Sequence, residues 1–442
     1  MLRAWSRRAL AWVVTSDAWH VPALVLGVSA VIVARCWPMF LEPTLPAEDG
    51  KRIFAYFYSN RELEYLVRAK AGYVPLLPNL LGFASVRLPV TWSPYFLTIA
   101  PACLTLVSFT WFARAEFSHV VSSRGVRLFA CLALALMPLS SYWFVCHTDY
   151  AIWNALFLLL LLSLLPGSDR PLRACVGFLA RAFLVWSHPL SFVALPVQAL
   201  QVIWSRGWVQ RISAIAVVGV QIMHLVLGVS FRRARVHGAE SAADFWLETL
   251  PAGASYVRDI VVPRSLLGVN TAARVAEEPS VLPAALTFLL LGAGALVLVL
   301  GPKMTTRWNC VLLAYFVAVL SVAVVSSEVP DQNATRYAYI QSFCCILIVC
   351  LAAAELGARF LSSRRTVRAL LAGGALLYAT VLCFRDLENY RDDRAENGER
   401  IANCTAKIAE LERAHGGPCG FELKCPKRRD WSFTVSPPDC EH

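Results

Sequence analysis

The chain has 442 residues, of which 57% are apolar and only 16% carry a formal charge. Its mean hydropathy is +0.55. This composition excludes an ordinary soluble domain, in which about 25% of residues are charged. The net charge of +11 does not indicate nucleic-acid binding, because Lys and Arg lie mainly in short connections between apolar stretches, where they act as topology signals. The sequence therefore predicts an all-α polytopic membrane protein with no nucleic-acid partner.

Apolar windows long enough to cross a bilayer recur from Val21 almost to the C-terminus. The first follows a basic N-terminus without a small-residue cleavage site, which predicts an uncleaved signal anchor. We predict a single bundle over residues 1–384, with large loops at 42–93 and 232–281, followed by a tail over 385–442. The bundle is expected to contain about eleven spans, at residues 21–41, 94–113, 128–143, 151–165, 174–186, 190–204, 212–230, 282–300, 311–325, 337–356 and 367–384.

The basic residues of the short connections predict the orientation. If the N-terminus is cytoplasmic, every short connection on that side is basic, as the positive-inside rule requires. An odd number of spans then places both large loops and the tail outside the cytoplasm, in contact with the outer face of the bilayer. The basic residues concerned are Arg114, Arg124, Arg127, Arg170, Arg173, Arg206, Arg211, Lys303, Arg307, Arg359, Arg364, Arg365 and Arg368.

The first loop carries apolar residues at three-to-four spacing between residues 51 and 68, among them Ile53, Phe57 and Leu66. This spacing predicts one amphipathic helix lying at the membrane interface. Further along, Ser187-His188-Pro189 separates the fifth and sixth apolar segments. Because both are short, they are either two spans or one helical hairpin that does not cross the membrane fully.

The cysteines fall into two groups. Ten lie in or beside apolar spans, where a thiol behaves as a small apolar side chain. The other four are in the polar tail, and an even set in an oxidising compartment predicts two disulfides whose pairing the sequence leaves open. Zinc is the alternative, although neither CxxC spacing nor clustered histidines accompany them. The tail is expected to hold a small helix and a stapled β segment. Its cysteines are Cys404, Cys419, Cys425 and Cys440.

Glu48 and Asp49 are the candidate catalytic residues. Two adjacent carboxylates just after the first span suit a general base that takes the proton of an acceptor hydroxyl. We favour Asp49, because Gly50 leaves its approach open. The alternative is structural, with one carboxylate capping the helix expected to start near Lys51.

Other polar residues fall on the same predicted outer side. Arg336 begins a span, where its guanidinium is suited to binding a phosphate through two parallel hydrogen bonds. His147, Asp149 and His188 lie in short turns and are candidates to line one cavity, although any span connection has such polar turns. His224, alone inside a span, is expected to pack against a neighbouring helix.

Several short patches together resemble the GT-C class of membrane glycosyltransferases, and within it a bacterial group with an external acidic loop. The patches are Glu48-Asp49-Gly50, Ala71-Gly72-Tyr73 with Pro78, Ser187-His188-Pro189-Leu190-Ser191-Phe192 with Pro196, Arg336-Tyr337, Cys425-Pro426 and Asp430-Trp431-Ser432. The chain departs from that group's pattern at Asn79, where an Arg is expected, and at His188, where a Gly is usual.

The resemblance implies transfer of a sugar from a polyprenyl-phosphate donor to a glycan, lipid or protein acceptor outside the cytoplasm of a bacterial inner membrane. It implies Asp49 or Glu48 as the base and an inverting reaction. Arg336, Lys51 and Arg52 would bind the donor phosphate, and Tyr73 would join the cavity residues. The class requires a divalent metal in some members only, and no ligand cluster here predicts one. The alternatives are an envelope polysaccharide polymerase or ligase and a non-enzymatic lipid or solute transporter.

Overall fold

The structure is a computed structural model that describes part of the chain. The described residues are 17–41, 43, 45, 49–60, 62–67, 74–121, 123–137, 143–165, 167–188, 190–232, 258, 262–267, 282–283, 285–287, 342, 346–347, 349–350, 373–383, 421–424 and 432–435. Within them the fold is helical apart from one short hairpin. His20–Trp37 and Val90–Ala113 are long and apolar enough to cross a membrane, and several shorter helices are also apolar. A count of about eleven spans remains a prediction.

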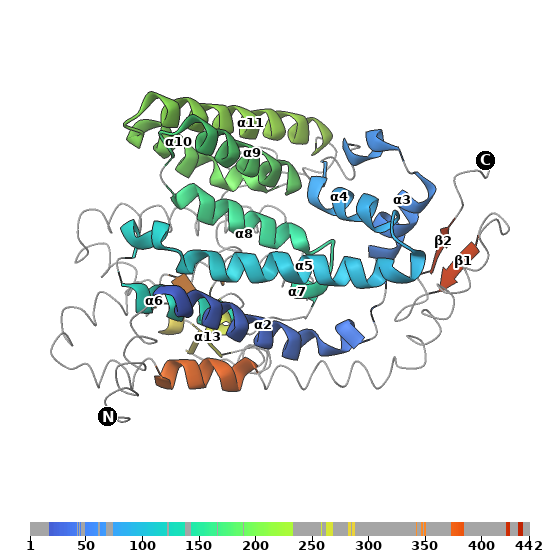
Figure 1. Ribbon diagram of the computed structural model, residues 1–442, viewed down its shortest axis with the longest axis horizontal. Coiled ribbons are helices and arrows are strands. Elements are labelled where there is room, and N and C mark those ends of the chain that lie inside the picture. Colours follow the sequence, from blue (N-terminus) through green and yellow to red (C-terminus); the bar gives the residue numbers. More distant parts are fainter. Residues whose placement is uncertain are drawn as a thin grey trace, which may run out of the picture.

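The long helices match the first seven predicted spans in order. They are α2 (Asp17–Leu41), α5 (Ser93–Thr110), α6 (Arg124–Ala135), α8 (Ala151–Leu164), α9 (Pro171–Ser187), α10 (Leu195–Trp204) and α11 (Trp208–Arg232). They lie side by side in layers, with α9, α10 and α11 on one side, α8 and α5 in the middle, and α2 and α6 beyond (Figure 1).

The third and sixth predicted spans differ in their limits, and for the sixth, α10 begins only at Leu195. Helix α6 begins at Arg124 and ends at Ala135, and the separate short helix α7 (Trp143–Cys146) follows. The prediction of one helix over 128–143 was therefore wrong. Pro138 accounts for the early end, because a proline disfavours helical geometry at the residue before it.

The helices alternate in direction, so their connections gather at two ends. At one end, Thr148 before α8 contacts Leu97 in α5, and the Trp153 ring lies 4.6 Å from the His188 ring after α9. We call this the loop end, because the described residues between 49 and 92 also lie there (Figure 1). At the opposite, far end, the Gln201 amide donates to the Leu165 carbonyl at 2.9 Å.

Buried polar contacts fix the helices against one another. Asn154 Nδ2 donates to Thr105 Oγ1 at 2.9 Å, and Ser108 Oγ donates to the Asn154 carbonyl at 3.3 Å. All three side chains are fully buried. Because an unpaired polar group is costly in apolar surroundings, these bonds specify the register between α5 and α8.

Buried arginines bind the last carbonyls of two helices. Arg35 in α2 donates to the carbonyls of Ala135 and Met137 at 2.9 and 2.7 Å. Arg181 in α9 donates to those of Leu162 and Leu165 at 2.8 and 3.3 Å. A cation is favourable at a helix C-terminus, where the carbonyls lack intrahelical partners. Each guanidinium therefore joins its own helix to the end of another.

The first loop is folded into short helices that pack on one another and, through α4, on the bundle. It contains η1 (Asp49–Phe54), α3 (Ala55–Ser59), η2 (Leu63–Val67), α4 (Leu76–Ser85) and η3 (Val90–Trp92). Apolar side chains of this segment form a second buried cluster with Leu97 of α5. Its members include Leu45, Ile53, Phe54, Phe57, Tyr58, Val86 and Val90. Helix α4 was not predicted.

The prediction of one amphipathic helix over residues 51–68 was wrong. The chain leaves helical geometry at Asn60, whose Nδ2 donates to the Tyr56 carbonyl at 2.7 Å. An asparagine side chain that bonds nearby backbone in this way competes with the helix. The apolar face before the break is buried against α4, where Gly82 leaves room for Ile53 and Phe57.

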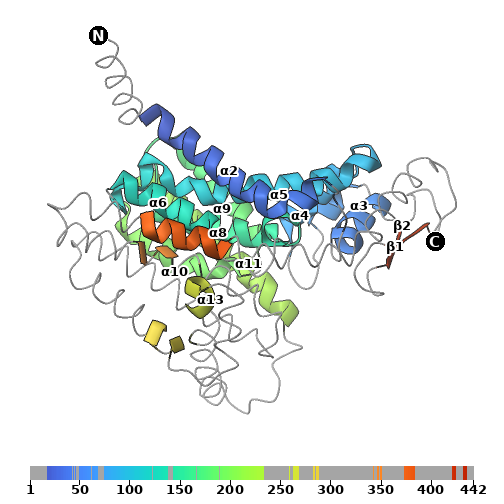
Figure 2. The same cartoon turned by 90° about the horizontal axis from the view of Figure 1, so that it is seen from below.

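The remaining short elements join or follow the bundle. They are η4 (Trp111–Ala113), η5 (Ala115–His119), η6 (Ser191–Ala194) and α13 (Val262–Leu267). Helix α9 ends at Ser187 and η6 begins at Ser191, so the chain breaks where the sequence predicts. A hairpin that does not cross the membrane fully remains a prediction. Figure 2 shows α13 and the helical segment 373–383 on the same side of the bundle.

The tail contains the expected β segment. Strands β1 (Phe421–Lys424) and β2 (Ser432–Val435) pair antiparallel, with Phe421 opposite Val435. Strand β2 packs against η1 and α3 at the loop end (Figure 1). The predicted tail helix and the four tail cysteines lie outside the described residues, so the two disulfides stay a prediction.

Candidate functional site

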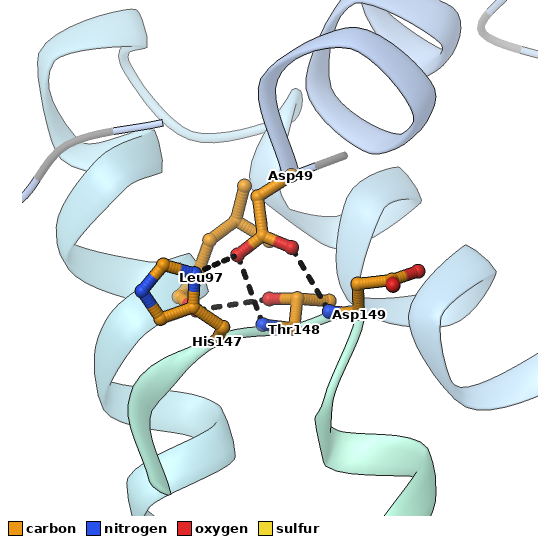
Figure 3. Close-up of polar contacts among 5 residues, drawn as sticks. All are labelled: Asp49, Leu97, His147, Thr148 and Asp149. Atoms are coloured by element: carbon orange, nitrogen blue, oxygen red, sulfur yellow. Dashed lines mark hydrogen bonds and ion pairs between the residues drawn. The ribbon is translucent and has the colours of Figure 1, made fainter. Parts of the chain in front are cut away.

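Asp49 lies at the centre of the polar contacts at the loop end. Its side chain is buried, with 3% of the residue exposed. Oδ2 accepts the backbone N–H of Thr148 at 2.9 Å, and Oδ1 accepts the backbone N–H of Asp149 at 2.9 Å (Figure 3). Both carboxylate oxygens are therefore held by residues about 100 positions further along the chain.

The reason for this contact lies in the start of α8. The Ala151 N–H donates to the His147 carbonyl at 3.0 Å, so residues 147–150 form the turn that leads into the helix. The N–H groups of a first turn have no intrahelical acceptor, and a carboxylate there also interacts favourably with the helix dipole. Asp49 therefore caps the turn before α8.

A second contact holds the same turn from α5. Thr148 Oγ1 donates to the Leu97 carbonyl at 2.9 Å, and Thr148 is fully buried. The turn at residues 147–150 is thus fixed on one side by η1 and on another by α5. The sequence analysis did not select Thr148. Its position as a polar residue just before an apolar helix was the signal that could have identified it.

His147 lies beside the Asp49 carboxylate but does not form a charged pair with it. The distance from His147 Nδ1 to Asp49 Oδ2 is 3.7 Å, which is longer than a hydrogen bond. Burial lowers the pKa of His147 to about 3, because the interior disfavours the charged imidazolium. Desolvation thus outweighs the attraction of the nearby carboxylate, and the ring is neutral at neutral pH.

Asp149 presents its carboxylate in a different direction. Its backbone N–H points to Asp49, whereas its side chain extends away from the Asp49 carboxylate (Figure 3). Asp149 is also partly exposed, unlike Asp49. The two aspartates therefore do not form a carboxylate pair, although one turn connects them.

His188 and His224 lie in a neighbouring group of polar contacts around the break between α9 and α10. His188 Nδ1 accepts the Leu190 N–H at 2.9 Å, and its ring packs edge-on against Trp153. His224 Nδ1 lies 3.2 Å from Ser191 Oγ, and its ring lies 5.3 Å from Trp186. His224 thus packs against the adjacent helix, as predicted, and His188 packs on α8 rather than on Asp49.

Other predicted site residues fall outside what the structure describes. These are Glu48, Tyr73 and Arg336, together with the side chains of Lys51 and Arg52, whose backbone belongs to η1. Asn79, at the position where the resembling group has Arg, is buried and donates from Nδ2 to the Leu66 carbonyl at 2.9 Å. Among the described residues, no group of three or more His, Cys, Asp or Glu is arranged to hold a metal ion.

The Asp49 carboxylate can have one chemical role and one structural role. A carboxylate has about four lone-pair positions, so the two N–H bonds leave Asp49 able to accept a further proton or hydrogen bond. The N–H groups also stabilise the charged form of the carboxylate and fix its direction. Structurally, the same bonds connect the first loop to α8.

Fold and site together define a helical protein that has two segments able to span a membrane and a buried, backbone-held carboxylate at one end of its helices. No protein-family model and no curated protein sequence matches the chain.

Proposed function

We propose that the chain is an integral-membrane glycosyltransferase that moves a sugar from a polyprenyl-phosphate donor to an acceptor outside the cytoplasm. The observation that carries the proposal is the burial of the Asp49 carboxylate at the end of an apolar helical bundle, held by two backbone N–H groups. The resemblance of its acidic loop to that of GT-C enzymes adds the reaction class.

The surface of the helices supports a membrane location. Trp37 and Trp92 near the loop end are 52% and 63% exposed, and Trp208 near the far end is 74% exposed. Between these ends, α2, α5, α9 and α11 expose Leu26, Val33, Ile99, Val107, Val176, Leu179, Ile215, Ile222, Met223 and Val226. An apolar surface of this kind is unfavourable in water, and tryptophans at both limits are typical of a bilayer interface.

The charges at the far end support a cytoplasmic N-terminus. Exposed arginines follow α5 and flank the starts of α9 and α11, namely Arg114, Arg170, Arg173, Arg206 and Arg211. The Arg114 guanidinium pairs with Glu116 at 2.6 Å. A basic far end faces the cytoplasm under the positive-inside rule, which leaves Asp49 on the outer side.

In the proposed reaction, Asp49 takes the proton of an acceptor hydroxyl while that oxygen attacks the anomeric carbon of the donor. The bond from this carbon to the phosphate oxygen breaks, and polyprenyl phosphate leaves. A single displacement of this kind inverts the anomeric centre. Arg336, Lys51 and Arg52 would offset the charge of the leaving phosphate, and Glu48 is the alternative base.

His147 has a different place in this scheme. Because its ring is neutral, it does not supply a positive charge to the phosphate. It shields one side of the Asp49 carboxylate from water instead, which strengthens the interaction of that carboxylate with a bound hydroxyl.

The test uses the purified full chain in detergent, with polyprenyl-phosphate hexoses and pentoses as donors and an extract of envelope glycans as acceptor. Asp49→Asn should lower sugar transfer about 100-fold or more, because general-base catalysis contributes roughly that much. Glu48→Gln is the matched carboxylate variant and should keep activity if Asp49 is the base.

Thr148→Val separates catalysis from positioning. It removes the bond to Leu97 in the same turn but leaves the carboxylate in place, so transfer should fall less than about tenfold. Full activity of Asp49→Asn, or equal losses in Asp49→Asn and Thr148→Val, would reject Asp49 as the base. Polymeric products would favour the polymerase alternative, and absence of transfer with every donor would favour a transporter.

A further inference from the structure

Two connections meet at the far end of the bundle, one between α8 and α9 and the other between α10 and α11. A methyl group at Gly167 in the first connection would lie 3.1 Å from Gln210 Cβ at the start of α11. At Gly207 in the second connection, a methyl group would clash with the Asp169 carboxylate. The helices that follow, α9 and α11, also pack side by side (Figure 1). The two connections are therefore in contact, although α9 and α10 separate them along the chain.

The charges of these two connections are unbalanced. Residues 165–173 and 204–213 together contain four arginines and one acidic residue, Asp169, which leaves three net positive charges. Arg211 donates to the Ser205 carbonyl at 3.0 Å through one of its two terminal nitrogens, and a guanidinium has five N–H donors in all. Positive charges that are brought together repel one another, and an anion bound beside them offsets this repulsion. We call the four exposed arginines the basic patch: Arg170, Arg173, Arg206 and Arg211.

Exposed apolar side chains begin directly beside the basic patch. In both α9 and α11 they are spaced by four and then three positions, so they share one face of each helix. Each row starts within two residues of an arginine and runs from the far end toward the loop end. The surface thus joins cations to an apolar track. The residues of the two rows are Leu172, Val176 and Leu179 on α9 and Trp208, Ile212 and Ile215 on α11.

We propose that the basic patch binds the headgroup of an anionic phospholipid in the cytoplasmic leaflet, with the acyl chains along the apolar rows of α9 and α11. A guanidinium donates two parallel N–H bonds to a phosphate, and basic sites between membrane helices on the cytoplasmic side bind such headgroups. A soluble acidic partner would use the arginines but would leave the apolar rows in water. A lipid is therefore the occupant that fits both features. The proposal rests on the proposed membrane location and orientation, and not on the transfer reaction.

The experiment measures lipid binding to the purified full chain in detergent by native mass spectrometry. Phosphatidylglycerol and phosphatidylcholine with the same acyl chains are titrated separately, and the fraction of protein that carries one lipid gives the affinity. The test variant combines Arg170→Gln with Arg206→Gln, which removes one arginine from each connection. The matched control combines Arg87→Gln at the loop end with Arg114→Gln, whose guanidinium is paired with Glu116. Unfolding curves in SDS check that both variants are folded.

The wild type should bind phosphatidylglycerol at least about tenfold more tightly than phosphatidylcholine. Each arginine beside an anionic headgroup contributes about fivefold to affinity, so the test variant should bind phosphatidylglycerol about 25-fold more weakly. The control variant should change by less than about threefold. Equal affinities of the wild type for the two lipids, or equal losses in the two variants, would overturn the proposal.

A competition experiment tests the role of the apolar rows. Glycerophosphoglycerol has the headgroup of phosphatidylglycerol without its acyl chains, so it should not displace the lipid at equal concentration. Displacement at that concentration would show that the apolar rows do not contribute, and it would overturn the assignment to a lipid. Because no sugar donor is present in these measurements, their outcome is independent of the transfer assay.

Discussion

Replacing Asp49 with alanine should destabilise the protein more than any loss of a surface charge. The substitution leaves the N–H groups of Thr148 and Asp149 without the acceptors found 2.9 Å away. A buried donor that loses its partner costs about 1–3 kcal/mol. Water entering the vacated space recovers part of this, and helix-cap substitutions cost about 0.5–2 kcal/mol. For the two N–H groups together, we expect the free energy of unfolding to fall by about 2–4 kcal/mol.

Asparagine at position 49 is the informative intermediate. Its carbonyl oxygen can accept one of the two N–H groups, but its NH₂ group then faces the other donor. Asp49→Asn should therefore lose about half as much free energy of unfolding as Asp49→Ala, roughly 1–2 kcal/mol. Asp169→Ala, at an exposed aspartate of the far end, is the matched control and should stay within about 0.5 kcal/mol of wild type.

The assay is unfolding of the detergent-solubilised protein by titration with SDS, followed through the fluorescence of its 14 tryptophans. The three variants are compared with wild type under the same conditions. If Asp49→Ala and Asp169→Ala have equal stability, the two backbone bonds do not contribute to the folded state, and the capping argument is refuted.

Two further predictions follow from the same end of the molecule. A methyl group at Gly82 would lie 2.6 Å from side-chain carbons of Ile53 and Phe57, so Gly82→Ala should cost about 1–3 kcal/mol of stability. The control is Gly177→Ala, whose methyl group meets nothing within 4 Å and which should be neutral or stabilising. Equal SDS unfolding curves for the two variants would contradict this. His147 has a pKa of about 3 in the folded protein against an ordinary value of 6.5, so below pH 6.5 the unfolded chain binds a proton that the folded protein does not. The free energy of unfolding should therefore fall by up to about 1.4 kcal/mol per pH unit as the pH drops below 6.5, and His147→Gln should remove this contribution. If wild type and His147→Gln show the same slope of unfolding free energy against pH between about pH 5 and 6.5, His147 is not buried in its neutral form.

The helices of the bundle were predictable because their signal is local. A run of apolar residues identifies a helix such as α8 or α11 without reference to the rest of the chain. The first loop was not predictable in the same way. Its apolar spacing continues past Asn60, whereas a side-chain bond to Tyr56 ends the helix there, and the apolar face packs on α4 instead of the membrane.

The candidate site was predicted in its residues but not in its connections. Asp49, His147 and Asp149 were all selected, yet their arrangement depends on a contact that spans 99 positions between Asp49 and Thr148. A contact between two residues this far apart leaves no periodic pattern in the sequence from which it could be predicted. The polar type of Thr148 was visible in the sequence, but its bond to Leu97 requires the packing of α5 against the turn.

The long separation of that contact has a consequence for how the protein is made. A ribosome that adds about 5–20 residues per second synthesises Thr148 roughly 5–20 s after Asp49, which is 99 positions earlier. During this interval the Asp49 carboxylate lacks the backbone N–H groups of Thr148 and Asp149 that it accepts in the folded protein. The Asp49 carboxylate can therefore reach its two donors only after α2, α5 and the turn before α8 have all been synthesised, and a variant that slows translation between residues 49 and 148 should prolong the exposure of the first loop to proteases.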